Sequence, residues 1–139
     1  MPEITYRTEL PGLEEYHALF ETTGWNDGYR ASPRELMTTL ERSWARIFAY
    51  DGDTLVATGR VVSDGVLYGM IYDLITLPSH QGRGIGSVIL ERLVARCQDA
   101  GLRGIQLYSA RGKADFYAKR GFVPRPDDGP GMTFVEPGS

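Results

Sequence analysis

The residues with the clearest chemical meaning are three alternating glycines that follow an apolar stretch and open a helical pattern. They stand in the run Ser79-His80-Gln81-Gly82-Arg83-Gly84-Ile85-Gly86-Ser87. Glycines let the chain turn sharply and let a ligand approach the backbone. The free N–H groups of a helix's first turn, with the positive end of its dipole, favour an anion. The spacing therefore predicts a loop that binds a pyrophosphate through backbone amides.

The register of these glycines excludes the two commonest nucleotide motifs. A dinucleotide fingerprint needs G-x-G-x-x-G, whereas the glycines here follow G-x-G-x-G, and the next strand (GIQLYSA, residues 104–110) ends without an acidic residue for a ribose. A Walker loop needs a lysine after its last glycine, and Gly86 is followed by Ser87. A glycine-rich turn without a ligand is the remaining alternative, but three such glycines at the start of a strong helix are costly without a use.

A second motif, Phe116-Tyr117-x-Lys119-x-Gly121-Phe122, follows after one predicted strand. Together with Gln81-x-x-Gly84-x-Gly86, it resembles the paired motifs Q/R-x-x-G-x-G/A and F-Y-x-K-x-G-F of the GNAT superfamily of N-acetyltransferases. The resemblance covers residues 45–123 well. Within the superfamily, Tyr72-Asp73, Leu-Tyr-Ser and the glycine-rich tail before Met132 resemble the chloroplast-type serotonin N-acetyltransferases and their small bacterial relatives.

The resemblance implies acetyl-CoA as the donor, with its pantetheine paired to the strand before the loop and its pyrophosphate on the loop amides. Many members of the superfamily have an asparagine where this chain has Ala110, so that contact is absent or comes from Ser109 or Arg111. For Arg83 taken alone, simple solvent exposure explains the residue equally well. The expected cofactor-binding residues are Leu74, Ile75, Thr76, Leu77, Gln81, Gly82, Arg83, Gly84, Ile85, Gly86, Ser87, Ser109, Phe116, Tyr117 and Lys119.

Tyr117 is the expected general acid, because acetyl transfer to an amine requires a proton for the leaving thiolate. The pKa of a tyrosine, about 10, is close to that of such a thiolate. This role rests on the second motif, since the helical pattern alone favours a core tyrosine.

Asp73 is the expected base, acting directly or through water. It interrupts the apolar stretch 66–77, where a buried carboxylate is costly unless it is paired or functional. Strand alternation places it on one face with Ile71 and Ile75. The alternative is a solvent-facing Asp73, or one paired with Arg60 of the neighbouring strand.

The acceptor site is expected from the first helices and the loop at residues 24–32. Trp25 and Tyr29 of this loop, with Tyr72 and Asp73, are the expected substrate-binding residues, and Glu21 and Asp27 lie nearby. Aromatic and acidic groups suit a protonated, partly apolar amine. We therefore expect a small arylalkylamine-like substrate. The alternatives are a protein or peptide N-acetyltransferase and a non-catalytic, acyl-CoA-binding regulatory module.

Hydrophobic periodicity and turn residues predict the elements that must position these groups. Strands are expected at residues 3–9, 45–50, 54–63, 66–77, 105–108 and 132–136. Helices are expected at 13–22, 32–44, 84–100 and 113–120. This order predicts one α+β domain over residues 1–139. With the resemblance, it implies a GNAT-like fold, with a mixed, mostly antiparallel twisted sheet of about six to seven strands and about four helices.

The composition narrows the class of partner. A net charge of −3 argues against nucleic acid as the main partner. The two histidines, His17 and His80, lie far apart, and Cys97 is the single cysteine, so no metal site is expected. His80 is expected to be an exposed loop residue. No apolar run suits a membrane span and no signal peptide is evident, which favours the cytoplasm. The resemblance is compatible with a homodimer, while the residues leave the oligomeric state open.

Overall fold

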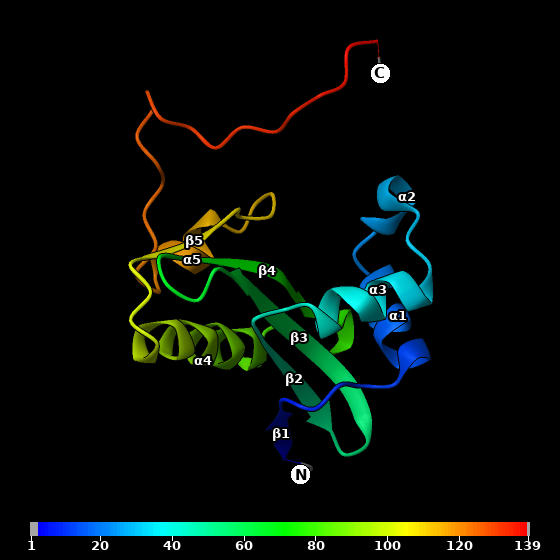
Figure 1. Cartoon of the computed structure of the whole chain (residues 1–139). Coiled ribbons are helices and arrows are strands. Elements are labelled where there is room, and N and C mark those ends of the chain that lie inside the picture. Colours follow the sequence, from blue (N-terminus) through cyan, green and yellow to red (C-terminus); the bar gives the residue numbers. More distant parts are fainter. Residues whose placement is uncertain (1–2, 139) are drawn as a thin grey trace. The chain divides into compact units, whose positions relative to one another are not determined.

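The computed structural model describes residues 3–138, within which five strands form a single sheet in the order β1-β2-β3-β4-β5 (Figure 1). Neighbours among the first four strands pair antiparallel, and β5 adds parallel to β4. The α+β, mostly antiparallel fold is confirmed, with fewer strands than the six to seven predicted. The strands are β1 (Ile4–Arg7), β2 (Ala45–Asp51), β3 (Thr54–Ser63), β4 (Tyr68–Thr76) and β5 (Gly104–Leu107).

Helices cover both faces of the sheet. The helices are α1 (Leu13–Glu21), α2 (Asn26–Tyr29), α3 (Pro33–Glu41), α4 (Ile85–Asp99) and α5 (Ala114–Ala118), with a short 3₁₀ turn η1 (Pro78–His80). Helix α1 packs on α3, β3 and β4, whereas α4 packs on β2, β3 and β4 from the opposite side (Figure 1). The sheet is therefore sandwiched between two helical layers.

Each layer has its own apolar core. On the side of α1 and α3, buried residues such as Tyr16, Leu40 and Phe48 form one cluster. On the side of α4, Gly59 makes room for the helix, because a Cβ on it would lie 2.8 Å from Ile89 Cγ2 and 2.9 Å from Leu93 Cδ1. The close approach of α4 to β3 thus depends on the missing side chain.

The start of α3 follows its predicted sequence signal. Ser32 Oγ accepts from the Glu35 N–H at 3.1 Å, and Glu35 Oε1 accepts from the Ser32 N–H at 2.9 Å, with Pro33 at the first helical position. The predicted extension to Trp44 is wrong. The helix ends at Glu41, and the Trp44 N–H donates to the Val61 carbonyl at 2.9 Å, as the chain enters the sheet.

Two further expectations need correction. The loop at residues 24–32 contains the short helix α2. Residues 132–136 form no strand, and Phe134 and Val135 are exposed. A strand exists through hydrogen bonds to a neighbour, and local composition does not reveal whether a partner is present.

The chain divides into two compact units, residues 1–107 and 108–139. The first unit contains the sheet and α1 to α4, and the second contains α5. The single domain over residues 1–139 stays a prediction.

Candidate active site

The loop between β4 and α4 has the backbone geometry that its glycines predict. Gly82 has φ 78° and Gly84 has φ 80°, in the left-handed region that favours glycine. At both positions no atom lies within 4 Å of the place a Cβ would occupy. Gly84 is the N-cap of α4. The backbone of the loop therefore faces open space, as the close approach of a ligand requires.

The amides of this loop form a set of donors suited to an anion. The first backbone hydrogen bond at this end of α4 runs from the Val88 N–H to the Gly84 carbonyl, at 3.2 Å. Among residues 3–138, no backbone carbonyl accepts from the amides of Gly82, Gly84 or Gly86. Together with the helix dipole, these donors fit a pyrophosphate.

Two side chains anchor the loop to the sheet. Gln81 Nε2 donates to the Thr76 carbonyl at 3.1 Å, which ties the loop to the end of β4. His80 Nε2 lies 2.9 Å from Asp51 Oδ2, and the His80 side chain is 16% exposed. The expected exposed His80 is thus wrong, because the ring packs against the turn after β2. Ile85 is buried and Arg83 is exposed, so at Ile85 the backbone alone faces the open side.

The edge of β4 that leads into this loop is open. β5 pairs with β4 from Tyr68 to Ile71, so from Tyr72 onward β4 has no strand partner on that side among the described residues. β3 occupies the other side, where the Leu77 N–H donates to the Val56 carbonyl at 2.8 Å. An extended ligand could pair with this free edge as an additional strand would.

A β-bulge interrupts β4 at the predicted base. Thr58 pairs with Ile75 and Arg60 with Tyr72, so two residues of β4, Asp73 and Leu74, lie opposite Gly59. Asp73 has φ 56°, a left-handed conformation that is uncommon outside glycine and that aspartate tolerates better than most residues. Bulges bend the strand and re-aim side chains, and here the bulge sits at the beginning of the open edge.

The bulge overturns the predicted alternation of β4. Ile71 pairs with Val61 and Ile75 with Thr58. Val61 and Thr58 lie three residues apart on β3, so they face opposite sides of the sheet. Ile75 therefore packs in the cluster with Tyr16, whereas Ile71 faces the α4 side. The expectation that Ile71, Asp73 and Ile75 share one face is wrong, because the extra residue shifts the pattern.

Asp73 forms an ion pair with Arg60, the alternative that the sequence left open. Arg60 Nε lies 2.8 Å from Asp73 Oδ2, and the two side chains are 16% and 18% exposed. Arg60 Nη1 also donates to Ser43 Oγ at 3.4 Å, and its guanidinium lies 5.6 Å from the Tyr72 ring centroid. The guanidinium holds the carboxylate in a fixed direction. Arg60 is thus part of the candidate site.

Tyr16 of α1 brings an unpartnered hydroxyl to the same region. The residue is 1% exposed, and its hydroxyl has no hydrogen-bond partner within the described part of the chain. Burial, with the nearby Asp73 charge, raises the pKa of Tyr16 far above its ordinary value, and the Arg60 charge acts in the opposite sense. Tyr16 is therefore a neutral hydroxyl close to the ion pair. Its place in the pattern of α1 indicated only a core residue.

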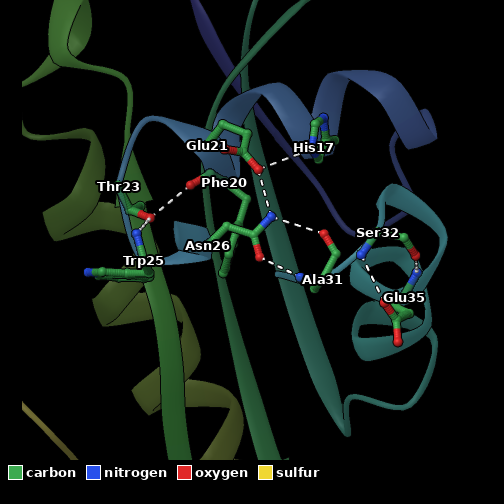
Figure 2. Close-up of polar contacts among 9 residues, drawn as sticks. All are labelled: His17, Phe20, Glu21, Thr23, Trp25, Asn26, Ala31, Ser32 and Glu35. Carbon is green, nitrogen blue, oxygen red and sulfur yellow. Dashed lines mark hydrogen bonds and ion pairs between the residues drawn. The ribbon is translucent and has the colours of Figure 1, made fainter. Parts of the chain in front are cut away.

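The expected acceptor loop is closed by a buried asparagine (Figure 2). Asn26 Nδ2 donates to Glu21 Oε1 at 2.6 Å and to the Ala31 carbonyl at 3.0 Å. Asn26 Oδ1 accepts from the Ala31 N–H at 2.8 Å. Glu21 Oε1 also lies 3.1 Å from His17 Nε2. One amide thus joins Glu21 at the end of α1 to Ala31, which precedes the N-cap of α3, a role that sequence reasoning missed.

The two predicted aromatic residues of this loop differ in their support. The Trp25 ring packs edge-on against Phe20 with ring centroids 6.0 Å apart. The backbone N–H of Trp25 donates to Thr23 Oγ1 at 3.0 Å. It is 39% exposed, so part of the indole remains available. Tyr29 is 76% exposed and lies at the end of α2. The Trp25 side chain is therefore held more firmly than that of Tyr29.

The second unit places Tyr117 in an aromatic cluster. Its ring lies 5.1 Å from that of Phe116 and 6.1 Å from that of Phe122, both nearly perpendicular. Burial raises the pKa of Tyr117, so the hydroxyl stays protonated at neutral pH, as a general acid requires. Ser109 and Lys119 are exposed, and Ser109 Oγ donates to the Ala110 carbonyl at 2.8 Å.

Comparisons with known proteins find similarity to acetyltransferases. A model of the acetyltransferase (GNAT) family matches residues 10–122. GCN5-related N-acetyltransferase 1, chloroplastic, of Arabidopsis thaliana is 32% identical over 130 residues, which cover 92% of this chain and 64% of that protein. Serotonin N-acetyltransferase 2, chloroplastic, of Oryza sativa subsp. japonica is 39% identical over 79 residues, which cover 57% of this chain and 40% of that protein. The chain thus spans less than two thirds of either plant relative.

A solved structure extends the similarity to the whole fold. A protein of unknown function from meticillin-resistant Staphylococcus aureus, described as a probable acetyltransferase, has a TM-score of 0.83 and 26% identity, covering 96% of this chain and 100% of that one. Among the described residues, no helix has the length and apolar character needed to cross a membrane. The same residues contain no group of three or more side chains able to hold a metal ion.

Proposed function

The chain belongs to the acetyltransferase (GNAT) family, and from this premise we propose that it acetylates the primary amine of a small arylalkylamine-like molecule. Members of this family use acetyl-CoA as the acetyl donor. The observation that carries the proposal is the open edge of β4 beyond Ile71, which runs directly into the amide-rich loop at Gly82–Ser87. An extended thioester arm ending in a pyrophosphate has the shape and charge that this surface accepts.

The residues of the first unit fit this donor. The backbone of Leu74–Leu77 would hold the extended arm, and the amides from Gly82 to Ser87 would hold the pyrophosphate. Side chains matter little for such contacts, which agrees with Ile75 and Ile85 being buried. The donor supplies an activated acetyl group; the protein supplies binding, orientation and proton transfer.

Asp73 and Tyr117 are the proposed proton-transfer groups. Asp73 would take a proton from the ammonium of the substrate, directly or through water, and its pair with Arg60 orients the carboxylate. Tyr117 would give its proton to the sulfur that leaves. Its raised pKa favours the protonated form that this role requires.

The acceptor surface supports an amine with an aromatic part. Trp25 exposes part of an indole held by Phe20, and Tyr72 lies beside Arg60 and Asp73 at the bulge. Aromatic faces attract both flat rings and ammonium groups. The plant relative named serotonin N-acetyltransferase 2 is compatible with this class of acceptor. The chloroplast locations in the relatives' names leave the cytoplasmic location of this chain a proposal.

Thiol release from acetyl-CoA with a panel of arylalkylamines, polyamines, amino sugars and peptides tests the proposal. We expect turnover with arylalkylamines, and a loss of about 10²–10⁴-fold in kcat for Asp73→Asn and for Tyr117→Phe. Both variants should still be stabilised thermally by acetyl-CoA. Turnover with peptides alone would favour a protein acetyltransferase. Donor binding without turnover on any amine would favour a regulatory module.

A further inference from the structure

A second concave surface lies on the first unit, away from the glycine loop. It is a groove of about 470 Å³ beside the beginning of β2, with Ala45, Ile47 and Leu93 among its lining residues. β1 ends at Arg7, which pairs with Phe48, so the segment from Ala45 to Ile47 has no β1 partner. The groove therefore occupies a part of the sheet edge that β1 does not cover.

Three arginines line this groove, and no carboxylate lines it. They are Arg46, Arg92 and Arg96, and none of them forms an ion pair within residues 3–138. The concentration of charge is unusual because the chain as a whole has a net charge of −3. A pocket with this lining attracts anions.

The spacing of Arg92 and Arg96 does not stabilise helix α4. They stand four residues apart on α4, where like charges repel each other and destabilise a helix. Asp99 lies three residues beyond Arg96 and would be a convenient partner, yet the Arg96 guanidinium lies 4.2 Å from the Trp44 ring centroid instead. Both guanidinium groups are thus directed away from neutralising carboxylates.

Aromatic and backbone contacts hold the arginines in place. The Arg92 guanidinium lies 4.5 Å from the Tyr6 ring centroid. Arg46 Nε donates to the Thr8 carbonyl at 3.2 Å and Nη1 donates to the Leu40 carbonyl at 3.3 Å, across the open edge. Stacked or hydrogen-bonded guanidinium groups lose little further freedom when they bind an oxyanion, and their planar forks fit phosphate and carboxylate.

We propose that this groove binds a small, multiply charged oxyanion, a phosphate or carboxylate compound, through Arg92 and Arg96 with Trp44 beside it. The volume is that of a small-molecule site, and the chemistry is the shared one of phosphates and carboxylates. The site is separate from the glycine loop, since Arg92 and Arg96 follow Gly84 by 8 and 12 residues, or about 12 to 18 Å along the helix.

Trp44 provides the measurement, because the chain has two tryptophans. In a Trp25→Phe background, the emission of Trp44 reports on the groove. We would titrate inorganic tripolyphosphate and, separately, citrate, with CoA present at saturation to occupy the glycine loop. The expected result is a saturable change in Trp44 emission with at least one of the two anions, and the tighter one identifies the source.

Single-charge variants test the residues. Arg92→Gln and Arg96→Gln should each weaken binding about threefold to tenfold, whereas Arg103→Gln, an exposed arginine outside the groove, should leave it unchanged. No change with either anion in the presence of CoA, a change that Arg103→Gln weakens equally, or one that never saturates would overturn the proposal. Because the readout is binding at Trp44 and not turnover, its failure is distinct from a failure of the proposed acetylation.

Discussion

The loop at residues 78–87, proposed to bind the donor and called the donor loop, and the loop at residues 24–32, proposed to bind the acceptor and called the acceptor loop, are fixed in different ways. The donor loop takes its shape from backbone conformation, with left-handed glycines that face open space. The acceptor loop takes its shape from one buried side chain, Asn26, which bonds to both of its ends. A loop that binds through amides must keep its surface bare, whereas a loop that presents aromatic side chains needs an internal support.

The largest expected effect is on the acceptor loop. Asn26→Ala removes three hydrogen bonds and leaves Ala31 and Glu21 without this partner, so the free energy of unfolding should fall by about 2–4 kcal/mol. The KM for the amine should rise more than the KM for acetyl-CoA. Urea denaturation and steady-state kinetics measure both quantities. The exposed neighbour Asp27→Ala is the control and should change stability by less than about 0.5 kcal/mol.

If Asn26→Ala left stability unchanged, or raised both KM values equally, the internal support of this loop would be refuted. Asn26→Asp refines the test, because an aspartate can still accept from the Ala31 N–H. It cannot donate to Glu21 or to the Ala31 carbonyl, and it places a second carboxylate beside Glu21. We expect it to remain destabilised, so the donor half of the amide would be the larger contribution.

A backbone change should separate strain from donor binding. Gly84→Ala forces a side chain into a φ of 80° and should cost about 1–2 kcal/mol of stability, without a steric clash. Gly101→Ala is matched, because Gly101 follows the end of the same helix with φ 74° and open space around it. Both should lose similar stability in thermal unfolding. A raised KM for acetyl-CoA in Gly84→Ala alone would confirm the donor loop; an equal rise in both would contradict it.

A smaller effect is expected from the anchor of the donor loop. Gln81→Ala removes the hydrogen bond to the Thr76 carbonyl and should cost about 0.5–1.5 kcal/mol. The KM for acetyl-CoA should rise severalfold at most, because the glycines, and not this side chain, set the shape. Kinetics at fixed amine concentration measure the change. A rise in the KM for acetyl-CoA as large as that of Gly84→Ala would show that the donor loop, like the acceptor loop, depends on a side chain for its shape.

The smallest effect at neutral pH concerns Tyr16. Tyr16→Phe deletes a hydroxyl that has no hydrogen-bond partner within residues 3–138, so the free energy of unfolding at pH 7 should stay the same or rise by about 1 kcal/mol. The pKa of Tyr16 is raised in the folded state, so the folded form holds its proton more tightly than the unfolded form. This contribution is complete below about pH 10 and is lost as the pH rises further. The variant should therefore lose stability less steeply than the parent protein in alkaline denaturation, and equal slopes for the two proteins would contradict this account.

The sequence predicted what the backbone and local periodicity determine. The glycines at 82, 84 and 86 predicted the turn before α4. The Ser32–Glu35 pair predicted the start of α3, because such a capping signal acts within one helical turn. Asn26 gave no signal, since its partners Glu21 and Ala31 meet it only in the folded loop. The bulge at Asp73 was equally hidden, because an extra residue in one strand is defined by the register of its neighbour.

The ion pair of Asp73 shows an intermediate case. Arg60 was identified from the sequence as a possible partner, because both residues interrupt apolar strands that were expected to be adjacent. Whether the carboxylate was paired or free depended on the bulge, which turns Asp73 toward Arg60 and away from regular alternation. The predicted strand at residues 132–136 is wrong for a related reason, since the sequence of a segment does not show whether a neighbouring strand is present to pair with it.

The bulge in β4 also limits how this strand can change during evolution. Before it, odd-numbered residues such as Ile71 serve the layer of α4; after it, Ile75 serves the opposite layer. Deleting the single residue Asp73 would leave Leu74 opposite Gly59 and Ile75 opposite Thr58, so the strand would become regular and each later side chain would keep its present face. The strand can therefore lose its bulge, and with it the ion pair to Arg60, without exchanging its buried residues, whereas a one-residue insertion or deletion elsewhere in the strand would turn the side chains beyond it to the opposite face.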